Sequence, residues 1–156
     1  MIARVAAIAI AATAAAAHAE PIDLGPATLA LDDGWIGAAP APDGVTRTRG
    51  AVTVVVRRWD VPNLPAWRSA TREAHLDAVA RGFATAPGYV ELARTAARTG
   101  KAGVPTLDLT FRRRGPGGDE VVAARVLMFR TLTMVAIAGG GERAAVERVA
   151  TSLSPD

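Results

Sequence analysis

The chain has 156 residues, with 18 lysines and arginines against 15 aspartates and glutamates, a formal net charge of +3, and no cysteine. So small a positive surplus does not favour a nucleic-acid partner, and a chain without cysteine forms no disulfide. With two histidines and no cysteine, a zinc site is not expected either. We expect neither a metal nor a cofactor.

The first nineteen residues contain the three parts of a secretory signal peptide in order. Arg4 supplies a positive start, residues 5–17 form an uncharged apolar run, and the Ala-His-Ala motif at 17–19 offers small residues to a signal peptidase. The run is shorter than the ~20 residues that span a membrane. We expect residues 1–19 to be removed and residues 20–156 to form a single periplasmic or secreted domain, with no transmembrane span after cleavage. The alternative is an uncleaved anchor.

The first half of the mature chain predicts short strands followed by a long helix. Residues 28–31 alternate apolar and small side chains, and the valine-rich segment 52–59 is the clearest strand. Residues 65–84 place two adjacent apolar rows at helical spacing, which is typical of a helix packed on a core. Pro87 and Gly88 end that helix.

The second half predicts a meander of four strands and a short closing helix. One strand alternates Leu and Phe with Thr and Asp, and the next has little polarity on either face, which favours a central position. The closing helix carries apolar residues between 146 and 153. Short turns between strands give an antiparallel sheet, so we expect an α+β fold: an antiparallel meander sheet with one long and one short C-terminal helix packed on one face. The four strands fall near residues 90–96, 107–111, 121–129 and 132–138.

Gly34-Trp35 follows an opening strand, and a valine-rich strand precedes the helix with Trp67. Gly103 opens a later strand, and Ser152-Leu153 lies in the closing helix. With these features, the order of elements resembles the PsbP-like superfamily, which includes bacterial DcrB-like periplasmic proteins. The resemblance spans nearly the whole mature chain and implies a non-enzymatic binding or assembly protein. It also implies core positions for two tryptophans, Trp35 and Trp67. No residue here matches the calcium sites of the photosystem branch.

No catalytic constellation stands out in the sequence. His75 is the one histidine after the signal peptide, and no serine lies in a Gly-Xaa-Ser-Xaa-Gly elbow. The segment 139–144 has the spacing of a dinucleotide-binding fingerprint, but that site requires a parallel sheet, so we interpret the segment as a loop and helix start. The acidic pairs at 32–33 and 119–120 are interpreted as solvated turns, with weak calcium binding at 32–33 as the alternative.

Arg112, Arg113 and Arg114 form the strongest charge feature, next to a glycine-rich hairpin turn. On a strand, the first and third side chains share a face and the second points away. One interpretation is a solvated hairpin end whose arginines discourage edge pairing. The other is a binding site for an anionic partner, such as a lipid headgroup, a polysaccharide or an acidic protein.

The leading functional hypothesis is therefore an exported protein that binds an unidentified protein or anionic envelope component and catalyses nothing. One alternative is an enzyme accessory subunit or a hydrolase-like enzyme with an atypical site. Another is an envelope-associated factor that binds lipid or glycan. The candidate binding residues are Arg112, Arg113 and Arg114.

Overall fold

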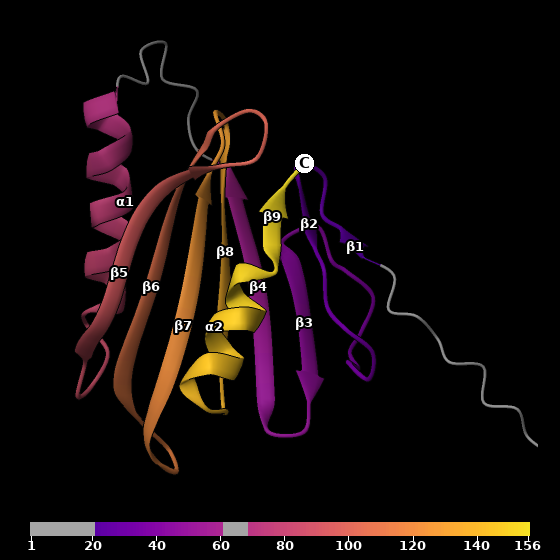
Figure 1. Ribbon diagram of the computed structural model, residues 1–156, viewed down its shortest axis with the longest axis vertical. Coiled ribbons are helices and arrows are strands. Elements are labelled where there is room, and N and C mark those ends of the chain that lie inside the picture. Colours follow the sequence, from indigo (N-terminus) through magenta and orange to yellow (C-terminus); the bar gives the residue numbers. More distant parts are fainter. Residues whose placement is uncertain (1–20, 61–68) are drawn as a thin grey trace, which may run out of the picture.

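The computed structural model describes residues 21–60 and 69–156 (Figure 1). The expected signal peptide at 1–19 and Trp67 lie outside the described residues. The described part is an α+β structure built on antiparallel strands, as the sequence predicts. Its elements in chain order are β1 (Ile22–Asp23), β2 (Ala27–Leu29), β3 (Gly44–Arg49), β4 (Val52–Asp60), α1 (Ser69–Phe83), β5 (Val90–Thr99), β6 (Val104–Gly115), β7 (Gly118–Met128), β8 (Leu132–Gly139), α2 (Arg143–Thr151) and β9 (Leu153–Pro155).

The main sheet has the strand order β3-β4-β8-β7-β6-β5, with every neighbouring pair antiparallel. The predicted meander is confirmed, because β5, β6, β7 and β8 are neighbours in chain order. The apolar strand β7 lies in the interior of the sheet, as its lack of polarity indicates. The β6–β7 hairpin closes at the Gly115–Gly118 pair, and Gly118 has a φ of 114°, which a residue with a side chain rarely adopts.

The two helices cover opposite faces of this sheet. Leu76 of α1 packs with Val126 of β7, whereas Val149 of α2 packs in the cluster that contains Leu127. Consecutive residues of a strand point to opposite faces, so α1 and α2 lie on different sides. The expectation that both helices pack on one face is wrong. The physical reason is that the central strands are apolar on both faces, and each face must be shielded from water.

Strand β6 is also buried on both faces, including the face that carries its polar residues. The alternation of its residues predicts a half-buried strand, yet Thr106 and Thr110, on the side of α2, are only 1% and 5% exposed. Their hydroxyls are satisfied inside the protein: Thr106 donates to the carbonyl of Val104 at 2.9 Å, and Thr110 donates to Glu147 at 2.9 Å. A threonine row can therefore be buried where a lysine row could not.

A small second sheet, β1-β2-β9, joins the two ends of the described chain (Figure 1). Leu29 of β2 pairs with Leu153 of β9, and both side chains are fully buried in the core on the α2 side. The sequence predicts that the closing helix ends near residues 154–155, but α2 ends at Thr151. The helix stops because Leu153 takes part in this long-range strand pairing.

Trp35 is half-buried at the margin of this core, not enclosed by it. Its indole Nε1 donates to Asp32 Oδ1 at 3.0 Å, and the guanidinium of Arg49 lies 5.0 Å from its ring centroid. The expectation of a buried anchor holds only in part for this residue, because Trp35 packs against the core but is half-buried. None of the described helices is long and apolar enough to cross a membrane.

Candidate functional site

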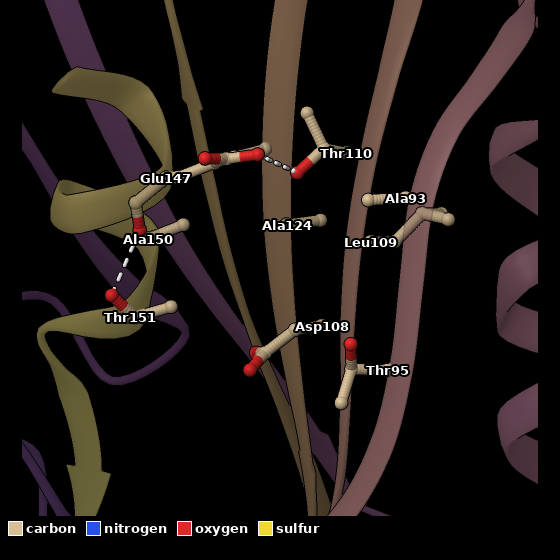
Figure 2. Close-up of a pocket in the computed structure, with 10 residues that line it drawn as sticks. Ala93, Thr95, Asp108, Leu109, Thr110, Ala124, Glu147, Ala150 and Thr151 are labelled. Carbon is tan, nitrogen blue, oxygen red and sulfur yellow. Dashed lines mark hydrogen bonds between the residues drawn. The ribbon is translucent and has the colours of Figure 1, made fainter. Parts of the chain in front are cut away.

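A groove of about 230 Å³ lies between α2 and strands β5 and β6 (Figure 2). Ala93 and Thr95 of β5 and Asp108 of β6 line it from the sheet, and Glu147 lines it from α2. Two carboxylates in one groove are the arrangement that acid–base catalysis uses. The contacts of each carboxylate decide whether the groove has that capacity.

Glu147 is held by two donors inside the groove. Its Oε1 accepts from Arg143 Nε at 2.8 Å and from Thr110 Oγ1 at 2.9 Å (Figure 2 shows the Thr110 contact). The hydrogen bond from Arg143 has the largest effect and holds the pKa of Glu147 below its ordinary value. Burial raises the pKa in part, and the weaker effect of the hydrogen bond from Thr110 lowers it again. A carboxyl group with a lowered pKa is ionised at neutral pH and is a poor general acid.

Asp108 is occupied by Arg125, its register partner on β7. Arg125 Nε and Nη2 donate to the two carboxylate oxygens, each at 2.7 Å. Arg125 Nη1 also donates to the backbone carbonyls of Thr151 and Leu153, at 3.0 and 3.3 Å. This pair therefore fastens the sheet to the end of α2 and the start of β9. Both carboxylates of the groove are engaged by arginines. Sequence reasoning missed Asp108 because its pairing with Arg125 follows only from the strand register.

The arginine hairpin, defined here as residues 112–120, contains the three predicted binding residues. Arg112 and Arg114 both approach Asp119, with Nε to carboxylate distances of 3.9 and 4.0 Å. Arg113 instead donates from Nε to Glu120 at 2.7 Å. The predicted alternation of the three side chains is confirmed. The acidic pair 119–120 is not a solvated turn, because it lies on β7 opposite the arginines.

The hairpin keeps a surplus of positive charge. Its three guanidiniums face two carboxylates, and Arg112 and Arg114 share one of them at the limit of ion-pair distance. The side chains of Arg112, Arg113 and Arg114 are 50%, 41% and 74% exposed. Exposed pairs of this kind contribute less than about 1 kcal/mol, so an incoming anion can compete for the arginines.

A rigid base supports the hairpin. Phe111, which precedes the arginines, is 1% exposed and lies with its ring centroid 5.5 Å from that of Phe83 and 5.1 Å from that of Tyr89. The backbone N–H of Arg114 donates to the carbonyl of Pro87 at 2.7 Å. The guanidiniums therefore extend from a fixed strand at one end of the sheet.

Other sequence candidates are accounted for by their surroundings. The segment 139–144 runs from the end of β8 into the first turn of α2, with Glu142 as N-cap. Helix α2 leads into the antiparallel strand β9, so the parallel strand of a dinucleotide site is not formed within the described residues. His75 Nε2 lies 3.1 Å from Thr133 Oγ1. Residues 21–60 and 69–156 contain no group of three or more His, Cys, Asp or Glu arranged to hold a metal.

No protein-family model matches the chain, and no curated protein matches it either. Several solved structures are similar to it, among them a cyanobacterial and a mycobacterial protein. The cyanobacterial PsbP (CyanoP) of Synechocystis has 15% identity and a TM-score of 0.53, with 84% of this chain and 87% of that chain covered. LpqN of Mycobacterium tuberculosis, involved in cell envelope biogenesis, has 16% identity and a TM-score of 0.58, with 87% and 90% covered. The PsbP-like fold expected from the sequence is therefore confirmed.

Proposed function

We propose that this protein is an exported, non-enzymatic binding protein whose arginine hairpin contacts an anionic component of the cell envelope. One observation carries the proposal: three exposed guanidiniums, fixed on a rigid strand, face only two carboxylates. Fixed cations with unmet charge attract anionic partners and speed the encounter with them.

A binding role, as opposed to catalysis, is supported by the contacts of the two carboxylates in the groove. Asp108 and Glu147 are both engaged by arginines, which favours structural work over acid–base chemistry. Export is supported by the signal-peptide pattern of residues 1–19. LpqN, which shares the fold, is described as involved in cell envelope biogenesis, and this agrees with an envelope location.

The test compares the mature protein with a triple variant, Arg112→Ser, Arg113→Ser and Arg114→Ser, as immobilised bait for an envelope extract. A matched control replaces Arg57, Arg72 and Arg148 by serine. These three arginines lie outside the hairpin and form no ion pair within the described residues. The control loses the same charge without touching the hairpin.

We expect the wild type and the control to capture the same anionic component, and the hairpin variant to capture much less. Capture by the wild type should weaken as salt rises, because the Debye length shrinks from ~10 Å at 0.1 M to ~3 Å at 1 M. All three proteins should unfold at similar temperatures, since exposed arginines add little stability. Equal, salt-independent capture by wild type and hairpin variant would overturn the proposal.

A further inference from the structure

Two exposed aliphatic side chains lie beside the arginine hairpin. Val90 and Leu92, at the start of β5, are 42% and 38% exposed, and they are among four large hydrophobic residues that the described chain leaves open to solvent. Val90 is the register partner of Arg112, and Leu92 lies in an irregularity of the β5–β6 pairing between Glu91 and Ala93. Apolar and cationic groups therefore meet at one place.

Together these segments form part of one end of the molecule, called here the basic tip and defined as residues 81–94 and 112–120. Figure 1 shows the connection from α1 to β5 and the β6–β7 hairpin at the same end of the sheet. The hydrogen bond from Arg114 to Pro87 joins the two segments. The tip contains five arginines and three acidic residues, a surplus of two positive charges.

The position of β5 explains why its aliphatic residues stay open. Strand β5 is the edge strand of the main sheet, and α1 ends at Phe83, before β5 begins. Val90 and Leu92 thus lie outside the apolar clusters that the two helices cover. Exposing an apolar pair to water is unfavourable in the free protein. A surface that combines apolar side chains with arginines binds best where an apolar phase and anionic groups occur together.

We propose that the basic tip docks on an anionic lipid surface, with Val90 and Leu92 entering between the headgroups and the arginines binding lipid phosphates. The inference rests on the proposed function and names its partner. A hydrated anionic glycan would satisfy the arginines but offers no apolar layer for the two aliphatic side chains. A lipid–water interface supplies both, phosphates at its surface and hydrocarbon beneath.

The test measures co-sedimentation of the mature protein with vesicles of phosphatidylglycerol and phosphatidylcholine, beside vesicles of phosphatidylcholine alone. The wild type should bind the anionic vesicles and not the neutral ones. Replacing Arg112 and Arg114 by serine should lower the partition constant about twenty-five-fold, since each arginine near an anionic surface contributes about fivefold. Replacing Val90 and Leu92 by serine should lower it about tenfold through lost burial of apolar area.

Ile36→Ser is the matched control, because Ile36 is 72% exposed but pairs with Thr48 of β3, at the opposite edge of the sheet. This variant should bind like the wild type. A second measurement uses the cysteine-free background: Leu92→Cys, labelled with an environment-sensitive fluorophore, should shift to the blue with anionic vesicles only. The same label at Ile36→Cys should not shift.

The outcomes separate this inference from the proposed function. In one outcome, the variant that lacks Val90 and Leu92 binds vesicles like the wild type, and the emission of the fluorophore at position 92 does not shift. Insertion of these side chains is then wrong, while the contact of the arginines with an anionic partner stands. If the wild type ignores vesicles but captures an anionic glycan or protein from the extract through its arginines, the lipid inference fails and the proposed function holds. If neither vesicles nor extract distinguish the hairpin variant, both fail.

Discussion

At the scale of single residues, the best-defined electrostatic contact is that of Asp32. Its Oδ2 lies 2.7 Å from Arg49 Nη1, and its Oδ1 accepts from the indole of Trp35 at 3.0 Å. The hydrogen bond from Arg49, followed by that from Trp35, lowers the pKa of Asp32 from 3.8 to about 2. The turn that the sequence assigns to solvent is thus joined to β3.

We predict that Asp32 titrates with a midpoint near pH 2 in a carboxyl-carbon NMR titration. Because the folded-state pKa lies below the unfolded value, Asp32 adds stability above pH 3.8, and this is lost as the pH falls toward 2. In Asp32→Asn, the free energy of unfolding should therefore depend less on pH across that interval. A midpoint at 3.8 would contradict the ion pair with Arg49.

At the scale of elements, Arg125 is the side chain that connects most parts of the fold. It binds Asp108 on β6 and the backbone carbonyls that end α2 and begin β9. Its side chain is only 14% exposed, against 31% for Asp108. Removing it leaves a half-buried carboxylate without its partner.

We predict that Arg125→Leu lowers the free energy of unfolding by about 2–3 kcal/mol, toward the low end of the range for broken buried ion pairs. The matched control is Arg143→Leu on α2, whose pair with Glu147 is exposed and spaced i,i+4. That change should cost less than about 0.5 kcal/mol. Urea denaturation followed by circular dichroism measures both values. A similar decrease in the free energy of unfolding for the two variants would show that Arg125 stabilises the fold no more than an exposed ion pair does.

The strands of the meander could be predicted because their signals are local. Period-two alternation marks β6 in the sequence, the glycine-rich turn marks the β6–β7 hairpin, and the lack of polarity places β7 in the interior. The opposite placement of the helices could not be predicted, because Thr106 and Thr110 alternate like an exposed row. Their hydroxyls are satisfied by local and cross-element hydrogen bonds that only the folded chain reveals.

The sequence predicts which face of the strand each candidate arginine occupies, but not which residues lie next to it on the neighbouring strands. Alternation along a strand correctly separates Arg113 from Arg112 and Arg114. The sequence does not show that Asp119 lies opposite them, since this follows from the hairpin register. It also does not place Val90 beside Arg112, a contact that joins residues 22 positions apart through the β5–β6 pairing.

At the scale of the whole molecule, the start and end of the described chain are built into one sheet. Strand β1 begins at Ile22, pairs with β2, and β2 pairs with β9. Leu24 and Leu29 from this first hairpin are buried with Leu153 in the core on the α2 side. Residues that follow the expected cleavage site are thus part of the core, and cleavage inside this hairpin would damage the fold.

We predict that export is accompanied by cleavage between Ala19 and Glu20, which leaves the β1–β2 hairpin whole. Amino-terminal sequencing of the exported protein should begin at Glu20. Replacing Ala17 and Ala19 by leucine should block the peptidase, which requires small residues at both positions, and should retain the precursor in the membrane fraction. Thr13→Leu is the control, because it keeps the apolar run and both alanines, and it should be processed normally. A mature protein that begins beyond Ile22, or a soluble exported product of full length, would contradict the expected site.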